Sequence, residues 1–239
     1  MNELILILSL VIEFGLVLLA YKLFGRAGLY IATAVYTVLA NIEVAMLVEA
    51  FGIEQTLGNV LFAGTFLITD ILSEVESKEA ANKAVNIGIF TSVIFIIITQ
   101  SWMLYTPTLD SLPFADGLRT VFSATPRIAA ASLLVYALTQ RFDVWLYHKW
   151  WALTEKRFGK RRFLWLRNNG STLISQFLNT VLFNVGAFAG TYDAATLVTI
   201  CAAGYVIYVV TSLLDTPFIY AARKMKERGM IPSSAGAEQ

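Results

Sequence analysis

The sequence predicts an all-α integral membrane protein that folds as a compact bundle of six to seven transmembrane helices. Of its 239 residues, 57% are hydrophobic and only 15% are charged, and the mean hydropathy is +0.65. Soluble domains carry about 25% charged residues. The chain also holds several apolar runs of about 20 residues, the length that spans a bilayer, and a soluble protein of this size could not bury them all.

Seven segments are long and apolar enough to span, and they predict one transmembrane domain over residues 1–228. Their expected limits are 3–23, 28–49, 57–76, 84–105, 126–147, 171–190 and 194–221. The third segment is the weakest of these candidates, because it is short and ends in acidic residues. A cap or a short re-entrant element is expected at 106–125, and a disordered tail at 229–239.

Basic residues alternate from one connection to the next. The connections on one side hold 15 Lys and Arg, and those on the other side hold 2. The positive-inside rule therefore predicts an N-terminus outside the cell and a cytoplasmic C-terminus. The basic stretch 148–167 could also suggest a nucleic-acid patch, but orientation and contact with lipid headgroups explain it better, and no nucleic-acid partner is expected.

The residue inventory argues against several enzyme classes. A single cysteine, Cys201, excludes an internal disulfide and a cysteine metal cluster, and a single histidine, His148, excludes a histidine-rich metal site. The chain shows no serine–histidine arrangement and no P-loop pattern. We therefore expect no enzyme, no cofactor and no metal, with an intramembrane acid–base enzyme as a distant alternative.

Two polar stripes enter the membrane on helical faces. On 126–147 the stripe follows spacings of 4, 4, 3 and 4 residues, and on 171–190 it again keeps to one face. The members are Ser132, Tyr136, Gln140, Asp143 and Tyr147 on the first segment, and Thr172, Ser175, Gln176, Asn179 and Phe183 on the second. Polar groups in hydrocarbon need partners, so the stripes indicate either helix–helix contacts or a ligand site.

Acidic residues give a third signal. Asp70 and Glu74 are four residues apart and so share a helical face. They could accept hydrogen bonds from a substrate, carry protons, or be solvated at the end of the helix. Glu13 and Glu43 also lie inside expected spans, and for them a structural role is favoured.

An ordered set of residues resembles one family. It comprises Asn41, Phe62, the element Thr69-Asp70-Ile-Leu-Ser-Glu74, then Arg127, Ser132, Gln140 and Asp143, then Trp165-Leu-Arg167-Asn168 with Ser171, Thr172, Gln176, Asn179, Phe183 and Phe188, and finally Thr216-Pro217 with Tyr220. In this set the chain resembles the queuosine precursor transporter family, also described as the VUT type of vitamin-uptake-like membrane proteins. The family usually has Asp where this chain has Asn179.

The resemblance implies uptake of 7-cyano-7-deazaguanine, 7-aminomethyl-7-deazaguanine or queuine across a bacterial inner membrane, for salvage in tRNA modification. It also implies a bundle similar to the substrate-binding subunits of energy-coupling-factor transporters. The expected substrate-binding residues are Asn41, Asp70, Glu74, Arg127, Gln140, Asp143, Arg167, Gln176 and Asn179. A flat ring would lie between aromatic side chains while amides and carboxylates bind its edge.

Two mechanisms fit this expectation. The first is a transporter that works alone, and the second is a binding subunit that needs separate ATPases. Small-residue faces on two of the segments would allow a homodimer without requiring one.

Overall fold

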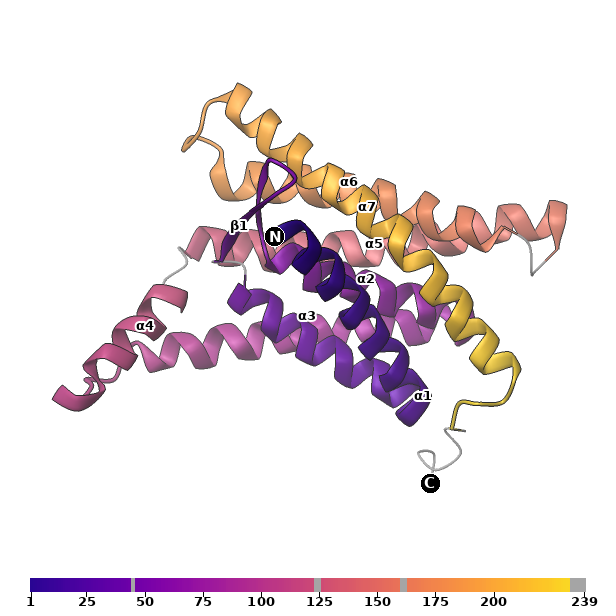
Figure 1. The fold of residues 1–239 in the computed structure, drawn as a ribbon, viewed down its shortest axis with the longest axis horizontal. Coiled ribbons are helices and arrows are strands. Elements are labelled where there is room, and N and C mark those ends of the chain that lie inside the picture. The colour runs from indigo at the N-terminus through magenta and orange to yellow at the C-terminus, as the bar shows by residue number, and fades with distance from the viewer. Residues whose placement is uncertain (44–45, 123–125, 160–162, 233–239) are drawn as a thin grey trace.

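The computed structural model describes residues 1–43, 46–122, 126–159 and 163–232, without side-chain detail at 53–55, 126–129 and 157–158. Seven α-helices in these residues pack into a bundle, which confirms the all-α class, with one small hairpin in addition (Figure 1). The elements are α1 (Asn2–Glu43), β1 (Leu47–Ala50), β2 (Ile53–Thr56), α2 (Gly58–Val75), α3 (Lys78–Trp102), the 3-10 helix η1 (Leu109–Ser111), α4 (Leu112–Phe122), α5 (Pro126–Phe158), α6 (Leu164–Phe188) and α7 (Ala194–Glu227).

Four helices in the described part are long and apolar enough to cross a membrane, namely α1, α2, α3 and α7. Helices α5 and α6 have the length but not the same apolar character, because both polar stripes lie on them. The two helices pack against each other over the largest helix–helix interface of the described residues. Their polar faces are thus mainly covered by protein.

Helix α1 consists of two arms that meet at Gly25. This residue has φ 57° and ψ −141°, a conformation that is essentially restricted to glycine. The Tyr36 hydroxyl donates to the Glu13 carbonyl at 2.7 Å, although 23 residues of straight helix would separate them by about 35 Å. The second arm therefore folds back on the first, and the arms correspond to the expected spans 3–23 and 28–49.

The second arm ends at Glu43 rather than at the expected residue 49. The residues that follow form an antiparallel hairpin, in which Ala50 pairs with Ile53 across the two-residue turn Phe51-Gly52. Both turn residues have positive φ, 56° and 71°, as the type I′ turn that matches the twist of a hairpin requires. The sequence pattern therefore predicts helix as far as residue 49, whereas the turn at Phe51-Gly52 places residues 47–50 in a strand.

The basic connection between α5 and α6 is shorter than expected. Helix α5 continues to Phe158, and α6 begins at Leu164 instead of 171. No proline or glycine interrupts residues 148–158, so the helix extends past the apolar segment until Gly159, whose φ of 82° suits a helix C-terminus. Hydropathy identifies the part of a helix that suits a bilayer, not the whole helix.

The connection between α3 and α5 contains η1 and α4, and no residue of α4 is buried. Gln100 donates to the Phe122 carbonyl at 3.0 Å, and the rings of Phe95 and Trp102 pack against the Phe122 ring. This segment covers the end of α3, as expected for a cap. At the other end of the chain, Ile231 packs against the core, and residues 233–239 of the expected disordered tail fall outside the described residues.

Helix α2 is the centre of the bundle (Figure 1). In its most apolar 18-residue window 78% of the residues are buried, against 28% in α1, 28% in α3 and 17% in α7. The core cluster collects residues of α2 together with residues from both arms of α1 and from α3. Most polar side chains of α2 are therefore surrounded by protein, and the positions of the site residues are described below along this helix.

Candidate functional site

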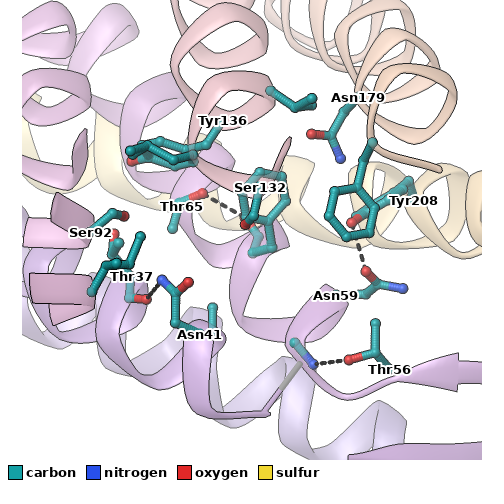
Figure 2. A pocket seen from close by; sticks show the side chains of 17 residues that line it. Thr37, Asn41, Thr56, Asn59, Thr65, Ser92, Ser132, Tyr136, Asn179 and Tyr208 are labelled. Atoms are coloured by element: carbon teal, nitrogen blue, oxygen red, sulfur yellow. Dashed lines mark hydrogen bonds between the residues drawn. The ribbon is translucent and has the colours of Figure 1, made fainter. Parts of the chain in front are cut away.

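A cavity of about 90 Å³ lies beside the first half of α2 and is bounded by α1, α2, α3, α5, α6 and α7 (Figure 2). A single water molecule needs about 10–15 Å³ of such space, so the cavity has room for a small ring system. The described lining contains no charged side chain. Its polar members are Thr37, Asn41, Thr56, Asn59, Thr65, Ser92, Ser132, Tyr136, Asn179 and Tyr208.

Aromatic rings form one wall of this cavity. The Phe62 ring meets the rings of Phe66, Tyr136 and Tyr208 edge to face, with centroids 5.4, 5.7 and 6.5 Å away. Tyr136 fits because it packs against Gly88 of α3, where a Cβ atom would collide with the tyrosine hydroxyl. The wall thus joins α2, α3, α5 and α7, and its rings can contact the face of a planar ligand.

Three asparagines supply amide groups around the cavity (Figure 2). Asn41 donates to the Thr37 carbonyl at 2.7 Å, and Asn59 accepts from the Tyr208 hydroxyl at 2.9 Å. Asn179 accepts a longer bond of 3.4 Å from Thr139. These bonds hold each amide, and among the described residues the carbonyl of Asn41 and the amino group of Asn59 have no other partner. Amides in this arrangement can read both donors and acceptors on a ligand edge.

A layer of buried polar side chains continues from the cavity along α2. Gln140 of α5 donates to Thr65 at 2.8 Å and accepts from Thr69 at 3.2 Å. The next residue of α2, Asp70, accepts from Thr172 at 3.0 Å. On α5, Asp143 accepts from Ser175 at 2.5 Å. Helix α6 therefore supplies hydroxyl donors to carboxylates of two other helices.

An ionic cluster closes this column at the far end of α2. Arg167 binds both oxygens of Glu74, at 2.8 and 2.7 Å, and the two side chains are 0% and 3% exposed. Tyr147 donates to Glu74 at 2.7 Å, and Arg223 pairs with it at 3.3 Å. The Arg167 guanidinium also lies 4.4 Å from the centroid of the Trp151 ring. Glu74 thus joins α2, α5, α6 and α7.

The start of α6 is fixed to α7 by amide groups. Asn168 donates to Asp215 at 2.7 Å, and Asn169 donates to Thr216 at 2.8 Å. The proline that follows, Pro217, cannot donate a backbone hydrogen bond inside α7. The polar groups near it therefore stabilise an interrupted part of that helix.

The residues predicted from the sequence fall into three positions. Asn41 and Asn179 line the cavity, and Gln140 contacts its wall through Thr65. Asp70 and Asp143 lie in the polar layer, and Gln176 is buried on α6 with its side-chain carbonyl unpartnered. The other predicted residues are Glu74 and Arg167, which occupy the ionic cluster, and Arg127, whose side chain is outside the described part of α5.

Sequence reasoning missed several lining residues. Asn59, Thr37 and Ser92 line the cavity but did not enter the predicted site. Thr33, Thr37 and Asn41 recur at four-residue spacing, so the same test of helical faces would have identified the α1 contribution. Ser92 follows Thr91 in an otherwise apolar stretch, and the sequence does not indicate which of these two hydroxyl groups lines the cavity.

Comparison with known proteins identifies the family. Residues 56–222 match the family described as "Putative vitamin uptake transporter". The chain belongs to this family. It is also 38% identical to a "Probable queuosine precursor transporter" of Bacillus subtilis (strain 168) over 215 residues, which cover 90% of this chain and 92% of the relative. No solved structure matches the chain.

Membership in the vitamin uptake transporter family assigns the chain to membrane transport of a small molecule, not to enzymatic catalysis. The matched range begins at Thr56 and ends at Ala222, so it contains α2 to α6 and most of α7. The cavity residues contributed by those helices and the whole polar layer lie inside it. The resemblance found in the sequence is thereby confirmed.

Proposed function

We propose that this protein imports a queuosine precursor, namely 7-cyano-7-deazaguanine, 7-aminomethyl-7-deazaguanine or queuine, across the bacterial inner membrane. The observation that carries the proposal is an uncharged cavity with an aromatic wall and an amide rim, found in a chain that belongs to this transporter family. The name of the Bacillus subtilis relative supports the choice of substrate.

The chemistry of the cavity suits such a substrate. A deazaguanine offers ring N–H donors and a carbonyl on one edge, and asparagine amides can bind both kinds of group. Asn41, Asn59 and Asn179 are therefore proposed to bind that edge, while the rings of Phe62 and Tyr136 cover the flat face. No charge needs to be neutralised for the cyano base.

We further propose that the cavity faces the outside of the cell. The basic connections of the chain meet near the ionic cluster, where Lys226 pairs with Glu76 at 2.7 Å and Arg223 pairs with Glu74. By the positive-inside rule this end of the bundle is cytoplasmic. The cavity lies at the opposite end of α2, which supports a conformation that is open to the outside and closed to the cytoplasm.

Transport then requires the closed end to open. A substrate leaving the cavity would first meet Gln140, then the level of Gln176, and finally the ionic cluster of Glu74 and Arg167. These residues keep the substrate-binding role proposed from the sequence as contacts made later along the path, and Arg127, at the start of α5 on the outer side of the cavity, keeps it as a contact made at entry. A homodimer also remains a prediction from the small-residue faces.

Reconstitution of the purified chain in liposomes tests the proposal. We expect uptake of labelled 7-cyano-7-deazaguanine, and competition by the other precursors but not by guanine. Asn59→Ala should weaken uptake at least tenfold, which corresponds to a loss of about 1.4 kcal/mol of binding free energy. Asn86→Ala, at an exposed amide that contacts Arg141 on the surface, is the matched control and should transport normally.

Two results would contradict this proposal in different ways. Binding of the precursor without uptake by the chain alone would favour a binding subunit that needs separate ATPases. Equal competition by guanine would reject the deazaguanine specificity while leaving membrane transport intact.

A further inference from the structure

Two buried carboxyl groups lie between the cavity and the ionic cluster. Asp70 on α2 is 1% exposed and Asp143 on α5 is 0% exposed. Each has one oxygen that accepts from α6, since Thr172 donates to Asp70 Oδ2 and Ser175 donates to Asp143 Oδ1. The other oxygens, Asp70 Oδ1 and Asp143 Oδ2, are buried and receive no bond from any donor in the described residues.

The two carboxyl groups face the same turn of α6. Thr172 and Ser175, which donate to them, are three residues apart and so share a helical face, which brings the two carboxyl groups close together. Asp215 of α7 adds another carboxyl group nearby, held by Asn168. Among the described residues no Lys, Arg or His forms an ion pair with these three aspartates.

The neighbouring cations are committed elsewhere. Arg167 of α6 and Arg223 of α7 both pair with Glu74, and Tyr147 of α5 donates to the same carboxylate. Two adjacent carboxylates without a countercharge cannot both stay ionised inside a membrane bundle, because desolvation and mutual repulsion add up. Such a pair is stable inside the bundle when one of its two groups carries a proton.

We propose that the Asp70–Asp143 pair is the proton-binding site that couples this transporter to the proton gradient. One proton enters from the outer side, binds the carboxylate pair and reaches the cytoplasm with the substrate. The inference rests on the proposed uptake function and names its energy source. The surroundings favour a proton over a metal cation, because the described residues contain no group of three or more Asp, Glu, His or Cys side chains that could hold a metal ion.

The position of the pair explains how substrate and proton could be coupled. Asn59 at the cavity and Glu74 in the ionic cluster are 15 residues apart on α2, a rise of about 22 Å, and Asp70 lies between them. On the cavity side, Thr65 in the wall binds Gln140, and Gln140 binds Thr69, the residue before Asp70. A substrate that shifts Thr65 or Gln140 therefore changes contacts next to the proton site.

The first experiment uses the wild-type protein in liposomes. Label exchange of 7-cyano-7-deazaguanine is measured without a gradient, and accumulation is then measured with the interior one pH unit more alkaline. For one proton per substrate we expect accumulation to rise about tenfold above the exchange level. A sodium gradient should produce no accumulation. Exchange without any response to the pH gradient would overturn the inference alone, whereas no exchange at all would also reject the proposed function.

The second experiment removes one carboxyl group at a time. Asp70→Asn and Asp143→Asn keep the side-chain shape but cannot hold the shared proton, so the ratio of gradient-driven accumulation to the exchange level of the same variant should fall from about tenfold to about one. Asp110→Asn, at an exposed aspartate of η1, should accumulate like the wild type. Accumulation by either Asn variant at the wild-type level under the same pH gradient would overturn the proposal, as would accumulation driven by sodium.

Discussion

At the scale of single residues, the cavity depends on small side chains as much as on polar ones. Gly88 leaves the space that the Tyr136 hydroxyl occupies, and Gly64 leaves space for the Tyr36 ring. A Cβ atom at either position would lie too close to a rigid aromatic side chain. Both glycines are thus required by close packing, and the shape of the cavity is set partly by residues that do not line it.

Gly88→Ala should therefore reduce substrate affinity. The new methyl group forces Tyr136 to move, and overpacking of this kind costs about 1–3 kcal/mol, equivalent to roughly tenfold or more in affinity if the ring enters the cavity. Binding titration of purified protein measures the effect. Gly204→Ala is the control, because its Cβ atom would lie 3.6 Å from Thr180 Cγ2, an ordinary contact. Equal affinities for the two variants would contradict this account of the wall.

The buried ion pair makes a second residue-scale prediction. Arg167→Met leaves the Glu74 carboxylate without its main partner, and removing one member of a buried pair costs about 3–5 kcal/mol. Arg119→Met, which removes an exposed pair with Asp116 on α4, should cost less than about 1 kcal/mol. Thermal unfolding in detergent compares them, and a smaller loss in Arg167→Met than in Arg119→Met would show that the cluster does not stabilise the bundle.

At the scale of elements, sequence patterns predicted the helices well and their ends less well. The expected segments overlap both arms of α1 and the long helices α2, α3, α5, α6 and α7, of which α1, α2, α3 and α7 are long and apolar enough to cross a membrane in the described residues. The hairpin at 47–56 was missed because a short apolar run fits helix and strand equally, and only Phe51-Gly52 signals the turn. The extension of α5 was missed because hydropathy falls where the helix leaves the bilayer.

The candidate site was predictable to a similar extent. Helical spacing placed Gln140 and Asp143 on one face, and the structure shows both turned into the protein. The partner of Glu74 is 93 residues away in sequence at Arg167, and no local pattern reveals such a pair. The packing of the helices decides which polar residues line the cavity and which bind each other. The sequence alone therefore could not separate these two groups of residues.

The reversal of α1 makes a prediction at the element scale. Gly25→Ala places a side chain at φ 57°, ψ −141° and close to the Pro232 carbonyl, and the strain should cost about 1–3 kcal/mol. Gly15→Ala, in the first arm with open space around it, should be neutral or stabilise by up to about 1 kcal/mol. The melting temperatures of the two variants and of the wild type in detergent measure these differences in stability. An unaffected Gly25→Ala protein would mean that the reversal tolerates ordinary backbone geometry.

At the scale of the whole molecule, the cavity and the ionic cluster occupy opposite ends of α2. The first is hollow and uncharged, whereas the second is packed, charged and cross-linked through Glu74. This asymmetry is what alternating access requires of a carrier in one of its two states, since the substrate path must be closed at one end while it is open at the other.

Labelling from outside the cell tests this asymmetry. In a Cys201→Ala background, Ser132→Cys in the cavity should react with a membrane-impermeant maleimide applied to intact cells, and the substrate should slow the reaction. Ser73→Cys, at a buried position directly before Glu74 on α2, should stay unreactive. Faster labelling at residue 73 than at residue 132 would reverse the assignment of the open end.

The shared polar interface of α5 and α6 also has a consequence for biosynthesis. Neither helix is as apolar as the other long helices, and their buried groups bind one another through Asp143 with Ser175 and through Thr139 with Asn179. Alone in the bilayer, each helix would expose these groups to lipid. We therefore expect the nascent α5 to be retained at the translocon until α6 has been synthesised, so that the two helices enter the membrane as a preassembled pair.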